Sequence, residues 1–137
     1  MKLFVRHYIL MSFLLLFLFM AAWFSIHNSR VSELNELLTN DAQLSQYPYE
    51  FKVISVKDKT VEIASPKTAQ VPSVYFLSVT FPELAGKSAV NPEVLKAQIE
   101  LAKIQGRAKK LVTLQPDIEQ VKWVIDEAWY TKHGITM

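Results

Sequence analysis

The sequence predicts an α+β protein with an N-terminal transmembrane helix and a stalk helix, followed by a small two-layer domain of antiparallel sheet and one long helix. Three observations predict it. Residues 8–26 are uncharged and apolar, β-branched and aromatic residues cluster from Phe51 onward, and residues 91–112 repeat apolar side chains at steps of three and four. The predicted regions are a cytoplasmic tail (1–7), a transmembrane helix (8–26), a juxtamembrane stalk and linker (27–46) and an extracytoplasmic domain (47–137).

The segment from Tyr8 to Ile26 has the length and composition of a membrane span. A helix of this length rises about 28 Å, close to the roughly 30 Å of a bilayer's hydrocarbon core. Tyr8 and Trp23 lie near its two ends, where amphipathic rings favour the interface. A cleaved signal peptide is the alternative, but its apolar part is shorter and ends in small residues, whereas Trp23 and Phe24 directly follow two alanines. We therefore expect an uncleaved signal-anchor.

The flanking charges predict the orientation of this helix. Lys2 and Arg6 precede the apolar segment, and all thirteen Asp and Glu residues of the chain follow it. Positive charge stays on the cytoplasmic side, so the tail is expected in the cytoplasm and the domain outside it. Because the chain has no cysteine and no N-glycosylation sequon, the simplest location is a bacterial inner membrane with a periplasmic domain.

The part after the apolar segment is formally neutral, because thirteen of the fifteen Lys and Arg residues remain there to balance the acids. A neutral domain has little electrostatic attraction to phosphate backbones. Nucleic acid is therefore not an expected partner.

Residues 29–44 carry an apolar stripe formed by Val31, Leu34 and Leu37 together with Leu38. This stalk helix packs either on its own domain or on another helix in a short coiled coil. The polar residues 41–48 then serve as a linker.

Three strands are expected next. Residues 51–56 and 60–64 read as an antiparallel hairpin around a polar turn. In residues 73–81 alternate side chains share one face, which predicts a third strand ended by Pro82.

Asn91, Pro92 and an acidic first turn predict the start of the long helix, which ends near Pro116. Gly106 lies inside it at a cost of about 1 kcal/mol. Residues 118–126 favour a strand, although helical spacing also fits them, and residues 127–133 predict a short helix capped by Gly134.

The sequence contains no convergent set of catalytic residues. His7 and His27 flank the apolar segment on opposite sides, His133 stands alone in the domain, and the three glycines are too far apart to form a phosphate-binding loop. Adjacent carboxylates such as Asp126 and Glu127 are ordinary surface charge. No catalytic, cofactor-binding or metal-binding residue is assigned.

The aromatic residues are the best candidates for a partner-binding site, because Trp and Tyr dominate interface hot spots. Trp129 and Tyr130 are neighbours and cannot both face one core direction from a short helix, so one of them is expected to be exposed or to contact another chain. The alternative is that these side chains fill a small core. The candidate set is Trp129, Tyr130, Trp123, Tyr47 and Tyr49.

The predicted layout resembles that of small inner-membrane components of bacterial pilus, secretion and flagellar assemblies, although no motif supports the resemblance. We expect a single-pass envelope protein that acts as a binding or assembly subunit, with a membrane or envelope protein, or a second copy of itself, as partner. The alternative is a membrane-tethered enzyme or small-ligand-binding module, which requires Asp126, Glu127 or His133 to point into a pocket.

Overall fold

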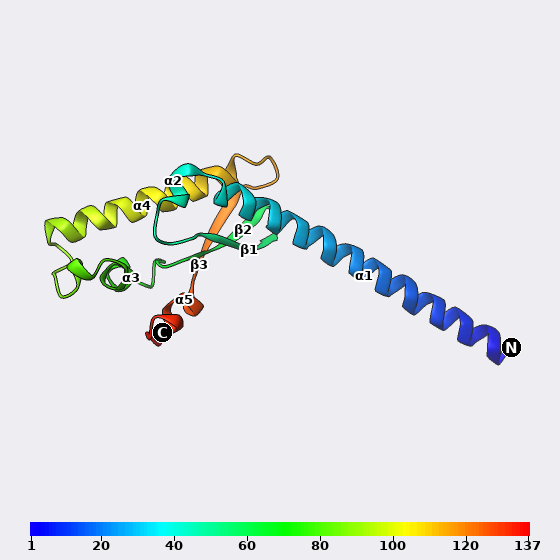
Figure 1. The fold of residues 1–137 in the computed structure, drawn as a ribbon. Helices are drawn as coiled ribbons and strands as arrows, with labels where there is room; N and C mark the ends of the chain where they lie inside the picture. Colours follow the sequence, from blue (N-terminus) through cyan, green and yellow to red (C-terminus); the bar gives the residue numbers. More distant parts are fainter.

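The computed structural model describes residues 1–137 as a long helical rod that ends in a small α+β body (Figure 1). The N-terminus lies at the free tip of the rod. The elements are α1 (Lys2–Thr39), α2 (Ala42–Ser45), β1 (Lys52–Lys57), β2 (Thr60–Ser65), α3 (Ser73–Thr80), a 3-10 turn η1 (Pro82–Leu84), α4 (Pro92–Thr113), β3 (Gln120–Ile125) and α5 (Glu127–Lys132).

Helix α1 is one unbroken helix that joins the apolar segment to the body. Residues 1–29 are all exposed, and by length and composition α1 is the one helix able to cross a membrane. Leu34 and Leu38, near its other end, are buried in the core. The stalk residues therefore pack on their own domain, which is the first of the two predicted alternatives.

The sheet has three strands in the order β1–β2–β3. Strands β1 and β2 form the predicted antiparallel hairpin, joined by a two-residue turn in which Asp58 and Lys59 both adopt positive φ angles. Strand β3 confirms the strand interpretation of residues 118–126 and pairs with β2 in parallel. The sheet is therefore mixed.

The predicted antiparallel sheet is wrong at β3. The chain leaves β2, passes through α3 and α4, and returns on the other side of β2. Because α4 carries the chain back along the body, β3 starts at the same end as β2 and must run parallel to it.

The predicted third strand is also wrong, because residues 73–80 form helix α3. Pro72 precedes this helix, and Phe81, just before Pro82, ends it. In the helix, Ser73, Phe76 and Leu77 face one side and are buried, so a single apolar face forms without a neighbouring strand. Tertiary burial thus overrides the β propensity of the segment.

The two C-terminal helices follow the sequence prediction. The Asn91 side chain accepts a hydrogen bond from the backbone N–H of Glu93 at 3.0 Å, with Pro92 in the first turn of α4. Helix α4 continues through Gly106 without a break. Helix α5 ends at Lys132, His133 is its C-cap, and Gly134 follows with φ of 79°.

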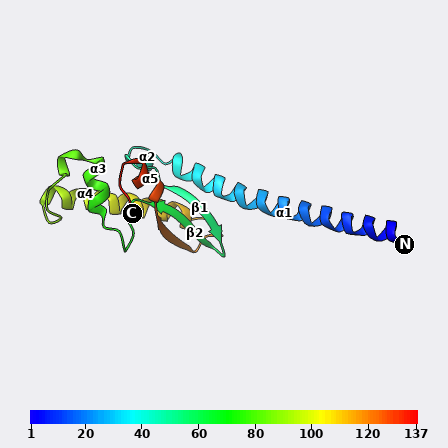
Figure 2. The ribbon, with the colours of Figure 1, turned by 90° about the horizontal axis from the view of Figure 1, so that it is seen from below.

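One face of the sheet is apolar and is covered by helices. Cross-strand rows join Val53 to Ile63 and Trp123, and Val56 to Val61 and Val121. The last turns of α1 lie along β1, while α4 contacts both α1 and β3. Figures 1 and 2 show the β1–β2 hairpin on the side of the body nearest the rod, and α3 with the N-terminal end of α4 on the far side.

Replacing Gly106 with alanine is expected to stabilise the protein by about 1 kcal/mol, because a Cβ at this helical position meets no atom within 4 Å. Gly134→Ala is the matched control and is expected to destabilise by about 1–2 kcal/mol, since its φ is positive. Urea unfolding of the full chain in micelles, read by fluorescence in a Trp23→Phe background, measures both. A destabilising Gly106→Ala would show that this position is constrained.

Candidate interaction surfaces

The five aromatic candidates belong to one connected cluster, in which Phe51 and Phe76 join the others. Tyr49 contacts Phe76, Phe51 and Trp129 with ring centroids 4.9–6.3 Å apart. Tyr49 and Tyr130 are 3% and 0% exposed, whereas Tyr47, Trp123 and Trp129 are half-buried. The structure therefore places two of the candidates inside the core, and three keep an accessible edge.

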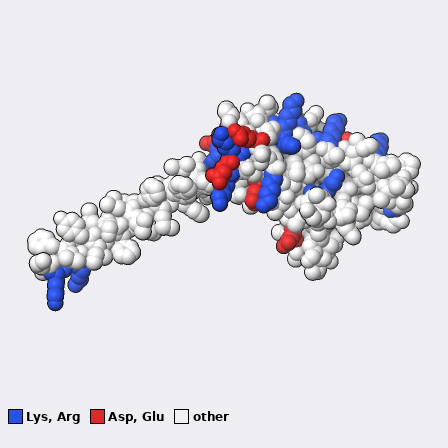
Figure 3. All heavy atoms as spheres, turned by 180° about the vertical axis from the view of Figure 1, so that it is seen from behind, with Lys and Arg blue, Asp and Glu red and all other residues white.

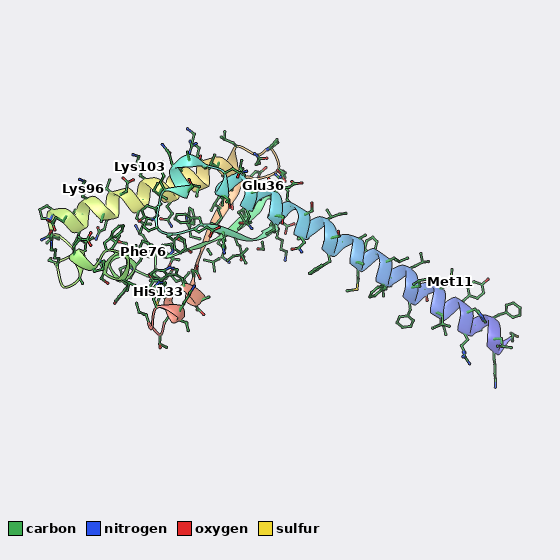
Figure 4. All side chains as sticks on the ribbon, in the orientation of Figure 1. Met11, Glu36, Phe76, Lys96, Lys103 and His133 are labelled. Atoms are coloured by element: carbon green, nitrogen blue, oxygen red, sulfur yellow. The ribbon has the colours of Figure 1, made fainter.

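Trp129 and Tyr130 point in different directions from α5. Tyr130 turns into the body and donates a hydrogen bond from its hydroxyl to the carbonyl of Pro66 at 2.5 Å. Burial raises the pKa of Tyr130 to about 12. The Trp129 ring stacks on the imidazole of His133, with ring centroids 4.0 Å apart. His133 is labelled in Figure 4. The partly open ring of Trp129 stays a predicted contact for a partner.

Asp126 holds the start of α5 against the segment that precedes β1. One carboxylate oxygen accepts a hydrogen bond from the Tyr49 hydroxyl at 2.8 Å, and the other accepts from the backbone N–H of Trp129 at 3.0 Å. Burial, followed by this hydrogen bond to Asp126, raises the pKa of Tyr49 well above its ordinary value. Asp126 therefore caps a helix and anchors a tyrosine.

The acid–base groups near the C-terminus lie at or near the surface of the body. Glu127 is exposed, and His133 uses Nδ1 in a 2.7 Å contact with the carbonyl of Trp129. No three His, Cys, Asp or Glu side chains gather closely enough to hold a metal ion. None of the five main cavities is lined by Asp126, Glu127 or His133.

Polar contacts fasten α1 to the body where the rod ends. The Arg30 guanidinium donates to both carboxylate oxygens of Asp117 at 2.8 and 2.5 Å, and to Glu33 at 2.9 Å. The ion pair with Arg30 lowers the pKa of Asp117. Figure 3 shows acidic and basic side chains together at this junction, beyond an uncharged shaft.

The side chain of Asn35 covers the outer edge of β1. Its amide oxygen accepts from the Val53 N–H at 2.7 Å, and its amide nitrogen donates to the Val53 carbonyl at 3.1 Å. The two bonds take the place of a neighbouring strand at a site where β1 would otherwise present unpaired backbone groups. The edge strand is thus closed by the same helix that carries the apolar segment.

The outward face of α4 carries apolar side chains without a partner. Leu95 and Ile99 are 42% and 68% exposed, and Ala102 and Gly106 continue the same stripe. Three lysines spaced seven residues apart run beside it and make no ion pair: Lys96, Lys103 and Lys110. Figure 4 shows Lys96 and Lys103 on the side of α4 away from the sheet, and Figure 3 shows basic side chains along this edge.

A cleft of about 540 Å³ lies between η1 and α4. Its apolar walls include Tyr47, Phe81 and Leu84, and Glu and Lys side chains surround them. The Tyr47 hydroxyl is buried without a hydrogen-bond partner. Burial, with a smaller contribution from the charge of Glu100, raises its pKa to about 12.

No known protein family matches the chain, and neither the curated proteins nor the solved structures give a match to it.

Sequence reasoning did not identify Asn35, Phe76 or the outward stripe of α4. The alternation of residues 73–81 predicts a strand at Phe76, and a single asparagine on a helix gives no signal of the strand edge that it covers. The α4 stripe was detectable, because Leu95 and Ile99 are four residues apart and lie outside the predicted core positions.

Replacing Asn35 with alanine is expected to destabilise the domain by about 1–3 kcal/mol, because two backbone groups of the buried Val53 lose their partners. The loss is expected even though alanine is the better helix former. Glu36→Ala, at the exposed neighbouring position, is the control and is expected to change stability little. Urea unfolding of the full chain in micelles measures both, and equal effects would contradict a role for Asn35 in closing β1.

Proposed function

We propose that this protein is a single-pass, membrane-anchored binding or assembly subunit of the bacterial envelope. In this proposal the N-terminus is cytoplasmic, α1 spans the inner membrane, and the α+β body is periplasmic. The observation that carries the proposal is the continuity of α1, which is exposed and apolar in its outer part and buried in the core at Leu34 and Leu38.

An exposed apolar helix of this length needs a nonpolar surrounding. Its backbone groups are bonded internally, so lipid is a suitable one. The only charged side chains in its first half are Lys2 and Arg6, at the tip that the charge rule assigns to the cytoplasm. Figure 3 shows these basic groups at the end of the shaft.

The body offers surfaces for binding and no converging catalytic set. The α4 face combines exposed Leu95 and Ile99 with three lysines that lack counter-ions. A membrane anchor restricts such a face to two dimensions, which raises its effective concentration near other membrane proteins. The open edge of Trp129 is a second contact candidate.

Topology and contact surface are tested together in a bacterial host that expresses the full chain. A cysteine at Val90, introduced into the cysteine-free chain, is expected to react with an impermeant maleimide while the inner membrane is intact. A cysteine at Leu3 is expected to react only after lysis. A protected Val90 position would refute the periplasmic location, and a mature mass lacking the residues before Trp23 would refute the anchor.

A photo-crosslinker at Ile99 is expected to give a discrete protein adduct, because this residue lies at the centre of the α4 stripe. A second variant carries the crosslinker at His133 and tests the exposed edge of Trp129. A third carries it at Tyr75, an exposed residue of α3, and serves as the control. Lys103→Glu is expected to weaken the Ile99 adduct selectively. An adduct only at His133 would move the contact to Trp129, and none at either position would contradict a binding role.

The cleft beside α4 favours a tethered ligand-binding module as the second candidate function, because the Tyr47 hydroxyl is buried there without a partner. Native mass spectrometry of the purified full chain is expected to show a bound small molecule that Tyr47→Phe loses. An unliganded mass for the native protein, obtained directly from membranes, would contradict this candidate.

A further inference from the structure

We propose that the β1–β2 hairpin is a second membrane contact, in which Ile54 enters the headgroup layer beside α1 and the turn lysines Lys57 and Lys59 bind anionic lipid headgroups. The proposal rests on the proposed function, since it requires α1 to lie in the bilayer. Beyond the proposed function, this contact would fix the height and the orientation of the body above the membrane surface.

The body cannot swing freely about the rod. Arg30 binds Asp117 with two hydrogen bonds on one side of α1, and Asn35 binds both backbone groups of Val53 on β1. Because α1 has no break between these contacts and the apolar segment, the direction of the span sets the direction of the body.

The body also lies too close to the apolar segment for a layer of bulk water to separate it from lipid. The apolar segment ends at Ile26, and Val31 is the first side chain of α1 that packs on the core. The helix between them rises about 7–8 Å. The headgroup layer on each side of the hydrocarbon core is about 5–7 Å thick.

The hairpin extends from the body toward the membrane end of α1. A shallow hollow is lined by α1 residues from Trp23 to Val31 and by Ile54 and Ser55 of β1. The hollow therefore extends along α1 from the strand as far as Trp23, an aromatic residue near the end of the apolar segment. Figures 1 and 2 show the hairpin on this side of the body.

A β-bulge exposes Ile54 to that side. The register between β1 and β2 shifts between Val53 and Ser55, so Ile54 is the extra residue with no cross-strand partner. Bulges re-aim side chains, and here the result is an isoleucine that is 49% exposed next to an apolar helix surface. Burial in the interface accounts for an apolar side chain at this position.

The turn places basic side chains at the same end of the hairpin. Lys57 makes no ion pair, and Lys59 pairs with Glu119 between two side chains that are each 63% exposed. An ion pair between side chains this exposed is weak, so Lys59 readily exchanges Glu119 for another anion. With Asp58 and Glu119 counted, this end of the hairpin is formally neutral, so the attraction for an anionic headgroup comes from the unpaired Lys57 and from Lys59 when it exchanges Glu119 for the headgroup.

Single-cysteine variants of the full chain, labelled with the fluorophore NBD, test the contact in liposomes. The three sites are Leu14 within the apolar segment, Ile54 on the hairpin and Val90 on the far side of the body. Liposomes of phosphatidylcholine alone are compared with a phosphatidylcholine–phosphatidylglycerol mixture. Quenching by lipids that carry a shallow spin label reports proximity to the headgroup region.

The Ile54 label is expected to be quenched several-fold more than the Val90 label, and more in the anionic liposomes. The double variant Lys57→Glu, Lys59→Glu is expected to abolish this anionic enhancement, while Lys132→Glu, at an exposed position of α5, is expected to leave it unchanged. Tryptophan emission in unlabelled versions of these variants verifies that the body stays folded.

The outcomes separate the two proposals. A solvent-exposed label at Leu14 would refute the anchor itself. A lipid-embedded Leu14 label with an Ile54 label as exposed as that at Val90 would overturn the hairpin contact. Equal Ile54 quenching in both lipids, unchanged in the double glutamate variant, would overturn the role of the two lysines.

Discussion

The structure depends on the burial of the last turns of α1 in the body. Leu34 and Leu38 supply core side chains, and Asn35 closes the edge of β1. The two leucines add apolar side chains to a domain too small to have many of its own. Asn35 binds backbone groups at a sheet edge that would otherwise be open. The body is therefore complete only when the helix that also carries the apolar segment is in place.

This sharing of one helix has a mechanical consequence. A flexible linker between anchor and domain would let the domain sample many orientations, whereas a continuous helix transmits any tilt of the apolar segment to the body. The Arg30–Asp117 pair adds a second fixed point, in the loop that leads from α4 to β3. A protein built this way presents the same surfaces in a fixed direction relative to the apolar segment, which supports the proposed assembly role.

A second set of contacts holds the remaining layers together. Asp41 caps α2 through two backbone N–H groups and also binds Arg107 of α4. The hydrogen bond with Arg107 lowers the pKa of Asp41. The residues expected to be a passive linker therefore tie the end of α1 to α4, and Tyr47 and Tyr49 beyond them pack on Phe76 of α3.

The sequence by itself determined the elements whose signals are local. The uncharged run of residues 8–26, the Asn91–Pro92 helix start and the hairpin follow from charge, capping and alternation within a few residues. Alternation also favours a strand over residues 118–126, although helical spacing fits them as well. Tertiary structure decided what depends on contacts distant in the chain. The alternation in residues 73–80 fits a strand, but burial of Phe76 and Leu77 selects a helix, and the return of the chain through α4 makes β3 parallel. The partners of Asn35 and the burial of Tyr49 and Tyr130 were likewise invisible in sequence, because each is set by residues that meet only after the body has folded.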